Sequence, residues 1–338
     1  MVENIRAQRK MVAILRILAE SSKPMGSTRI AEKLRWHGLD LSERTIRNYL
    51  SETDQVGWTV NLGRRGRLLT DLGRREGQDA LAFEKVGFVS ARVDNLTYEM
   101  TFDPHTREGK VVLNISFLKR DDLRGAWGAM RTIFDARLGM GRYAALGIAS
   151  QPIGSTRVPA GHCAFGTVCS VSINGMFLRA NIATTSRFGG LLEFENGEPK
   201  RFTEIIMYDG SSLDPLEIFI RGHMTSVTKV AETGSGVIGA SFREVPAAAV
   251  AEVQRLATLS ERIGVGGVLA IGSPDQPLFG IPVAQGRVGL VVCGGLNPVA
   301  AVAEAGIEVT NMAMSSLFGF DGLTEFGKLG TLIKSKGW

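Results

Sequence analysis

The feature that most constrains the fold of this chain is an internal repeat of part of its sequence. Residues 115–152 align without gaps to residues 240–277, which lie 125 positions later, and ten of the 38 aligned positions are identical. After a two-residue gap, residues 158–176 align to residues 281–299. Because a repeated sequence builds a repeated structural unit, the body of the chain is predicted to be an internal duplication.

Each copy has the residue pattern of a strand, a helix, two strands, a helix and a strand. In the first copy these elements are predicted at about 111–118, 121–137, 143–149, 163–171, 174–183 and 189–194. This β-α-β-β-α-β order is typical of ferredoxin-like units. We therefore expect an α+β fold with two such lobes, at about residues 86–200 and 201–330.

Two glycine-rich stretches, GMGRYA and GVGGVL, resemble a dinucleotide-binding fingerprint. That fingerprint requires a strand, then the glycines, then a helix. Here a predicted helix comes before the glycines and a strand follows them. The glycines are therefore predicted to end helices rather than to hold a nucleotide.

The positive charge of the chain is concentrated at its N-terminal end. Residues 1–75 carry 15 Lys and Arg against 8 Asp and Glu, whereas the remainder carries 24 against 26. A basic segment joined to a nearly neutral body favours a polyanion as the partner of that segment alone. We therefore expect one domain at residues 1–75 and a regulatory domain at residues 76–338.

The basic segment has the pattern of a winged helix-turn-helix. Apolar residues at helical spacing predict helices in residues 9–21, 25–38 and 40–58, with Ser27 and Ser42 as N-caps of the second and third. Residues 58–70 read as a strand, a basic turn and a strand. The third helix of such a domain enters the major groove, and wing arginines neutralise phosphates. The predicted DNA contacts are Ser42, Arg44, Thr45, Arg47, Asn48, Arg64, Arg65 and Arg67.

A winged helix can also bind another protein. Two observations favour operator DNA over a protein as the partner of this segment. The charge excess lies entirely in this segment, and its third helix presents Arg and Asn, which pair with guanine and adenine.

The stretch GHCAFGTVCSVSING, residues 161–175, has the composition of a reactive site. His162, Cys163 and Cys169 supply at most three metal ligands, and strand alternation would place the two cysteines on one face and His162 on the other. No second Cys/His pair completes a site, so no metal is expected. No nucleophile or metalloprotease motif accompanies the cysteines, which also fit as small buried apolar residues. We therefore expect no catalytic residue here.

The turns after the repeated strands are the other candidate site. In GGLNPV, Asn297 is predicted to be an N-cap with Pro298 as the first helical residue, so backbone N–H groups face a carboxylate or phosphate. Plain helix capping explains the same residues equally well. Arg243 could pair with a ligand carboxylate, although an internal ion pair with Asp214 or Glu217 is slightly favoured. The predicted ligand-binding residues are His162, Cys163, Thr167, Cys169, Ser172, Asn174, Arg243 and Asn297.

Taken together, the motifs PAGHCAFGTVCS, FGGLLEF, DPLEIFI, GASFREVP and GGLNP behind a winged helix resemble the NrpR family of nitrogen-regulatory transcriptional repressors. The resemblance covers essentially the whole chain. Some members carry two regulatory domains after the winged helix, and this chain has one. The resemblance implies a homodimeric repressor of nitrogen-assimilation or nitrogen-fixation operons, with 2-oxoglutarate as the inducer and no other cofactor.

Two other functions remain as alternatives. The body could be a Cys-dependent enzyme attached to a DNA-binding domain, or it could sense a partner protein instead of a metabolite. Three irregularly spaced cysteines argue against a disulfide framework and favour a reducing compartment. The longest uncharged runs are too short to span a bilayer, so a cytoplasmic protein without membrane contact is expected.

Overall fold

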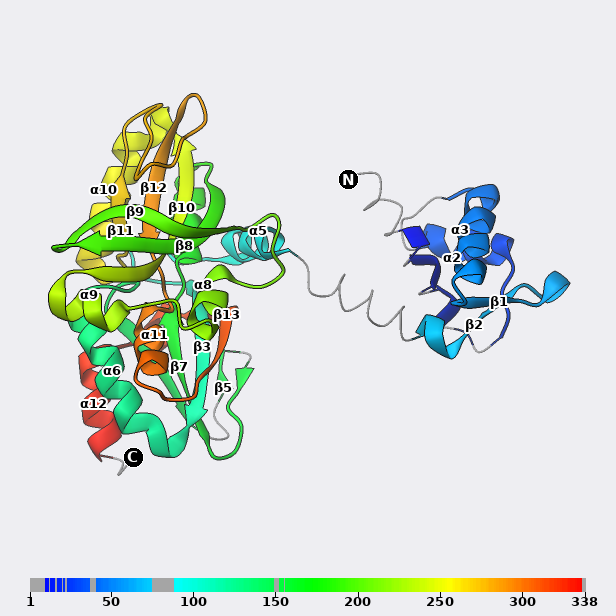
Figure 1. Cartoon of the computed structure of the whole chain (residues 1–338). Coiled ribbons are helices and arrows are strands. Elements are labelled where there is room, and N and C mark those ends of the chain that lie inside the picture. The colour runs from blue at the N-terminus through cyan, green and yellow to red at the C-terminus, as the bar shows by residue number, and fades with distance from the viewer. Residues whose placement is uncertain are drawn as a thin grey trace. The chain divides into compact units, whose positions relative to one another are not determined.

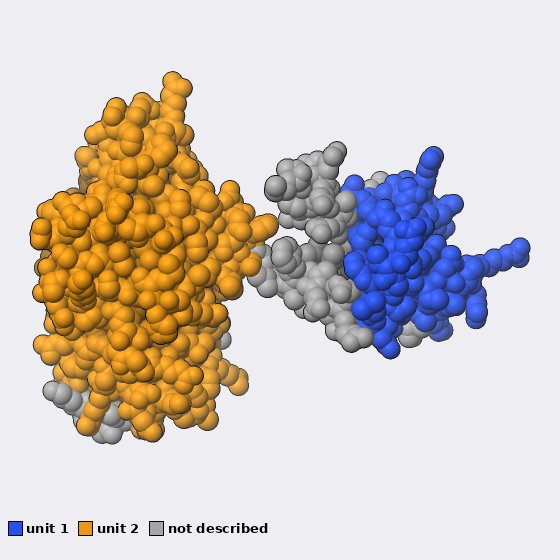
Figure 2. All heavy atoms as spheres, in the orientation of Figure 1, with its two compact units in different colours: residues 1–87 blue, residues 88–338 orange. Residues whose placement is uncertain are grey.

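The structure is a computed structural model of the 338-residue chain. It describes residues 10, 11, 13–15, 17–19, 21, 23–36, 41–74, 88–148, 152–154 and 156–335. The chain forms two compact units, residues 1–87 and 88–338, which Figure 2 shows in different colours. Each unit has hydrophobic core residues of its own.

The first unit is a winged helix, as predicted. Helical residues at 10–11, 13–15 and 17–19 precede α2 (Ser27–Trp36), α3 (Glu43–Gln55), β1 (Thr59–Asn61) and β2 (Arg67–Leu69). Met25 bridges to Arg67 and so adds a short third segment to the wing. The apolar faces of the three helical segments form one core, which includes Ile14, Leu18, Ile30, Leu34, Ile46 and Leu50.

The predicted N-cap of α2 was wrong by one residue. Ser27 already lies inside the helix, and the carbonyl oxygen of Gly26 accepts the first helical hydrogen bond, from the Ile30 amide, at 3.1 Å. Glycine is also tolerated at this position. The other predicted cap, Ser42 of α3, is confirmed, because its side chain accepts from the Thr45 amide.

The second unit contains both repeats. The first comprises β3 (Lys110–Lys119), α6 (Leu123–Asp135), β4 (Tyr143–Ile148), β7 (His162–Val168), α7 (Val171–Arg179) and β8 (Thr185–Glu195). The second comprises β10 (Gly236–Pro246), α10 (Val250–Ile263), β11 (Val268–Ile271), β12 (Arg287–Cys293), α11 (Asn297–Glu304) and β13 (Thr310–Gly319). Outside the repeats lie α5 (Val89–Glu99), β5 (Pro152–Ile153), β6 (Thr156–Arg157), β9 (Glu198–Met207), α8 (Pro215–Arg221), α9 (Val227–Thr233), β14 (Thr324–Glu325) and α12 (Phe326–Ser335). No helix within the described ranges is long and apolar enough to cross a membrane.

The two repeats exchange their last strands. The strand orders of the two main sheets are β13-β3-β7-β4-β14 and β11-β12-β10-β8-β9. Thus β8, which ends the first repeat, pairs with β10 of the second, and β13 pairs with β3 of the first. Figure 1 shows the result as two lobes, with β8, β10 and β12 in the upper one and β3 and β7 in the lower one. The β-α-β-β-α-β order and the α+β class are confirmed, and neither sheet is built from a single repeat.

The helix before each exchanged strand also packs against the other repeat. On α7, Met176 and Phe177 belong to the same buried core as Val253 and Leu256 of α10. On α11, Val299 and Val302 share a core with Ala126 and Met130 of α6. The exchanged piece is therefore the last helix and the last strand of each repeat.

The two segments in which the chain passes from one lobe to the other are in contact. A Cβ atom on Gly295 would lie 2.2 Å from the carbonyl oxygen of Val168 and 3.1 Å from the Cα of Cys169. Any side chain at position 295 would therefore separate the chains where they cross. The buried Cys169 lies at this junction, which explains why a small residue stands there.

The structure also corrects the alignment of the repeats. The strands β7 and β12 begin 125 residues apart, and so do β8 and β13. The two-residue shift that the sequence alignment placed after residue 152 therefore lies earlier in the fold, before β4 and β11, because α6 and α10 begin 127 residues apart. Consequently Asn174, which lies inside α7, corresponds to Val299 and not to Asn297.

The C-terminal helix α12 packs on the lower lobe. Phe326, Leu329 and Ile333 are buried in the core shared by α6 and α11. The ring of Phe326 stacks on Phe134 with centroids 4.1 Å apart, and it also stacks on Trp127 at 6.1 Å. These aromatic contacts fix the helix against α6.

We expect Phe326→Ala to lower the free energy of unfolding of the second unit by about 3–5 kcal/mol, because it leaves a cavity among stacked rings. Urea denaturation followed by circular dichroism measures the change. Tyr98→Ala is the matched control, since Tyr98 is 82% exposed and should cost no more than about 0.5 kcal/mol. Equal effects of the two variants would contradict a packing role for α12.

Candidate functional site

The first candidate site is the exposed face of α3. The Ser42 hydroxyl accepts from the Thr45 amide at 3.2 Å and so fixes the start of the helix. Ile46 and Leu50 are buried, whereas Arg44, Arg47 and Asn48 are exposed. Arg47 makes an exposed ion pair with Glu43 at 2.9 Å, which solvent weakens. These side chains stand on the face that a winged helix turns toward base edges.

The wing arginines have two different environments. Arg64 and Arg65 are exposed in a tight turn, Gly63–Arg65. Arg67 is largely buried, and its Nε donates to Asp54 Oδ2 at 2.8 Å, which ties the wing to the end of α3. Of the three, Arg64 and Arg65 therefore present a guanidinium without a carboxylate partner among the described residues.

The second candidate site surrounds Arg243 on β10. Arg243 is only 1% exposed. Its Nε donates to Asn174 Oδ1 and its Nη1 to the Ser241 hydroxyl, both at 2.6 Å. The Asn174 amide in turn donates to the Ser186 hydroxyl at 2.8 Å. We refer to Arg243, Asn174, Ser241, Ser186 and the neighbouring Tyr208 as the Arg243 cluster.

The predicted ion pair of Arg243 was wrong. Among the residues that the structure describes, no carboxylate lies within ion-pair distance of this guanidinium. Asp214 instead caps α8 by accepting from the amides of Leu216 and Glu217. The carboxylate of Glu217 accepts from the Ala313 amide. Arg243 is therefore a buried cation with neutral hydrogen-bonding partners.

The electrostatics of the cluster follow from burial. Desolvation lowers the pKa of Arg243 from its usual range. Burial, followed by the charge of Asp214, raises the pKa of Tyr208, so its phenol stays protonated. Burial and then the nearby Glu217 raise the pKa of Asp214 to about 6. A buried, uncompensated cation is costly, and a ligand carboxylate would supply the missing charge.

Only one of the two lobes contains this cluster. The sheet registers match Arg243 with Ser116, because Arg243 pairs with Ser186 and Leu290 as Ser116 pairs with Asn311 and Phe165. The positions that correspond to the first four cluster residues, in the order given above, are Ser116, Val299, Asn114 and Asn311. The chain therefore has one cationic cluster and one uncharged counterpart.

The other predicted ligand-binding residues are not members of the Arg243 cluster. The N-cap prediction for Asn297 was wrong, because this residue is inside α11 and its amide group bonds the backbone of Gly239 and Leu138. The Ser172 hydroxyl bonds the Val112 backbone. Thr167 has a buried hydroxyl without a hydrogen-bond partner in the described part of the chain. His162 lies at the other end of β7, with Nδ1 3.0 Å from the Ala160 carbonyl oxygen.

The cysteines are separated and buried. Cys163 packs in the core of α6 and α12, and Cys169 in the core of α7, so the expectation of a common face was wrong. Strand β7 ends at Val168, where its alternation stops. Within the described ranges, no three His, Cys, Asp or Glu residues gather closely enough to hold a metal ion.

We expect all three cysteines to resist alkylation in the folded protein at pH 8. Burial raises the pKa of Cys163 and of Cys169 to about 11 and that of Cys293 to about 12, so the reactive thiolate is scarce below those values. Intact mass after iodoacetamide treatment measures the reaction. The urea-unfolded chain, in which all three should react, is the control. Rapid modification of one cysteine in the folded state would revive the Cys-enzyme alternative.

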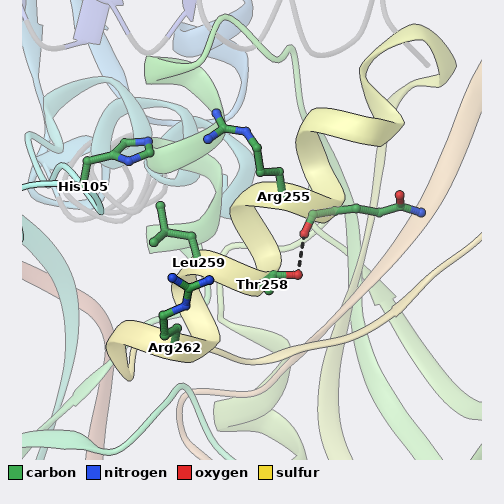
Figure 3. A pocket seen from close by; sticks show the side chains of 6 residues that line it. His105, Arg255, Thr258, Leu259 and Arg262 are labelled. Carbon is green, nitrogen blue, oxygen red and sulfur yellow. Dashed lines mark hydrogen bonds between the residues drawn. The ribbon is translucent and has the colours of Figure 1, made fainter.

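A surface pocket of about 440 Å³ lies along α10. Figure 3 shows His105, Arg255, Thr258, Leu259 and Arg262 around it. Its arginines are exposed, and Arg255 is paired with Glu252. None of the predicted ligand residues lines this pocket.

Sequence reasoning missed three members of the Arg243 cluster. Ser241 carried a usable signal, because the sequence alignment of the repeats matches it with an identical residue, Ser116. Ser186 and Tyr208 carried none, since strand exchange and the loop after β9 bring them to Arg243.

Comparisons with known proteins agree with this architecture. Residues 86–325 match the family model described as NrpR regulatory domains NRD1 and 2. Residues 12–76 match a winged-helix domain model named for ribonuclease R. A solved structure of a nitrogen repressor-like protein from Methanococcus jannaschii is 26% identical with a TM-score of 0.61, and the match covers 71% of this chain and 99% of that one.

Sequence matches to similar curated proteins extend over almost the whole chain. The global nitrogen regulator NrpRI of Methanosarcina mazei is 35% identical, over 94% of this chain and 98% of its own length. The global nitrogen regulator NrpR of Methanococcus maripaludis is 30% identical over 90% of this chain, which spans 53% of that relative. With a winged helix followed by one regulatory domain, the chain belongs to the NrpR family.

Proposed function

We propose that this chain represses transcription of nitrogen-assimilation and nitrogen-fixation genes and that 2-oxoglutarate releases it from its operator. The names of the similar proteins, global nitrogen regulators, support the repressor half. The exposed Arg44, Arg47 and Asn48 support DNA as the partner of the first unit. As a homodimer in the cytoplasm, the protein would present two α3 helices to half-sites about 34–36 Å apart.

The single observation that carries the sensing half is Arg243, a buried guanidinium held by neutral partners. A dicarboxylate such as 2-oxoglutarate supplies the missing negative charge, and a carboxylate matches the fork of an arginine. Asn174 and Ser241, which bond Arg243, are placed to bond the ligand as well. The body then acts as a sensor rather than as an enzyme.

Calorimetric titration with 2-oxoglutarate tests this function. We expect saturable binding of one ligand per chain, because only one lobe contains the cationic cluster. Succinate and glutamate are the controls for selectivity. Two ligands per chain would contradict the assignment to Arg243, and no binding by the folded protein would remove 2-oxoglutarate as the effector.

A further inference from the structure

Helix α5 has an unusual N-terminal cap. The side chain of Phe88, its N-cap residue, supplies no hydrogen bond. Instead, the Val89 amide donates to the Ser211 carbonyl oxygen at 2.9 Å and the Ser90 amide to the Tyr208 carbonyl oxygen at 3.2 Å. The segment 208–211 therefore does what a capping side chain normally does.

The same segment begins in the Arg243 cluster. The Tyr208 ring is buried beside Ser241, whose hydroxyl accepts from Arg243 Nη1 at 2.6 Å. Three residues beyond Ser211, Asp214 interacts electrostatically with Arg92 of α5. The side chain of Tyr208 thus faces the cluster while its carbonyl group holds α5.

A second connection runs through α7. Asn174 bonds Arg243 at 2.6 Å, and the next residue, Gly175, packs against Met100 at the end of α5. A Cβ atom on Gly175 would lie 2.5 Å from the terminal methyl group of Met100. One end of α5 is therefore held by the helix that supplies Asn174 to Arg243, and the other end by the segment whose Tyr208 lies in the cluster.

We propose that α5 is the output element of the Arg243 cluster and passes its ligand state to the DNA-binding unit. This inference rests on the proposed function. A carboxylate that binds the N–H groups of Arg243 not used by Asn174 and Ser241 pulls on the guanidinium that these two side chains hold, so their bonds to it change. The contacts of α7 and of segment 208–211 with α5 then change together. In the chain, α5 is the first described helix after the winged helix, and residues 75–87 connect the two.

Val89→Pro tests the connection without touching the cluster. Proline is tolerated as the first helical residue, and Phe88 already has the extended conformation that proline requires before it. The variant lacks the N–H group that bonds Ser211. Val89→Ala, which keeps that group while shortening the same buried side chain, is the matched control.

In the wild type and in Val89→Ala, 2-oxoglutarate should weaken operator binding by roughly 5–150-fold, the usual range for allosteric coupling. In Val89→Pro the ligand Kd should stay within about twofold of the wild type, while the effect on operator binding falls below about twofold. Full response in Val89→Pro would overturn the inference.

Hydrogen exchange supplies a readout that needs no ligand and no proline variant. In Arg243→Leu, the Val89 and Ser90 amides should exchange at least about tenfold faster than in the wild type, because their acceptors lose their support. The amide of Leu329 in α12 is the control and should not change. Unaltered exchange at Val89 and Ser90 would overturn the inference. If the wild type binds no 2-oxoglutarate, the proposed effector fails, and this measurement still decides the role of α5.

Discussion

Arg243→Leu should abolish the response to 2-oxoglutarate while leaving the regulatory unit at least as stable as the wild type. Loss of a buried, charged hydrogen-bonding partner typically weakens binding by about 2–5 kcal/mol, roughly 30-fold to several-thousand-fold. The same change removes an uncompensated buried charge, and apolar replacement of buried charges is often neutral or stabilising by about 1–4 kcal/mol. The other repeat also carries an uncharged residue, Ser116, at the matching position.

Calorimetry and urea denaturation measure the two effects separately. Arg287→Leu is the matched control, since it makes the same substitution in the same sheet at an arginine that faces a carboxylate. Arg287 bonds the Glu244 backbone and lies 3.9 Å from the buried Glu244 carboxylate. Its replacement should lower the free energy of unfolding by about 1–3 kcal/mol and leave ligand affinity nearly unchanged. If Arg243→Leu retained the wild-type Kd, Arg243 would not be the carboxylate site.

The order of the helices and strands could be predicted because a short sequence pattern determines each of these elements. Apolar spacing, the Ser42 cap and the glycine turn at 63–66 predicted the winged helix. The strand and helix order of the repeats followed in the same way. The exchange of the last helix and strand of each repeat could not be predicted, because both repeats carry the same pattern and either pairing buries equivalent faces. The close approach of Gly295 to Val168 shows where the chains cross, and one glycine does not reveal such a contact in a sequence.

The candidate site was harder to predict than the fold because its residues come together only through the exchange. Arg243 and Asn174 were both predicted, and they bond each other from different repeats. The two-residue gap in the alignment made Asn174 and Asn297 look equivalent, which hid the uncharged counterpart of the cluster. The motif around Cys169 instead marks the junction of the two lobes. Small and polar residues in that stretch satisfy backbone groups, as Ser172 does for Val112.

Asn48→Ala should reduce affinity for the operator by about 1–3 kcal/mol, roughly 5–150-fold, while affinity for random DNA changes little. Asn48 is exposed on α3 and suits bidentate bonding to adenine. Arg64→Ala should instead weaken binding to both DNAs by a similar factor, because a phosphate contact carries no sequence information. It should also reduce the slope of log affinity against log salt by about one.

Fluorescence anisotropy with operator and random duplexes over a salt series separates these effects. Arg67→Ala is the control for the wing. Its guanidinium is paired with Asp54 at 2.8 Å, so its loss should lower stability by about 1 kcal/mol and leave the salt slope unchanged. If Arg67→Ala changed the slope as much as Arg64→Ala, the internal pair would not persist on DNA. If Asn48→Ala bound operator as the wild type does, α3 would not read bases through this residue.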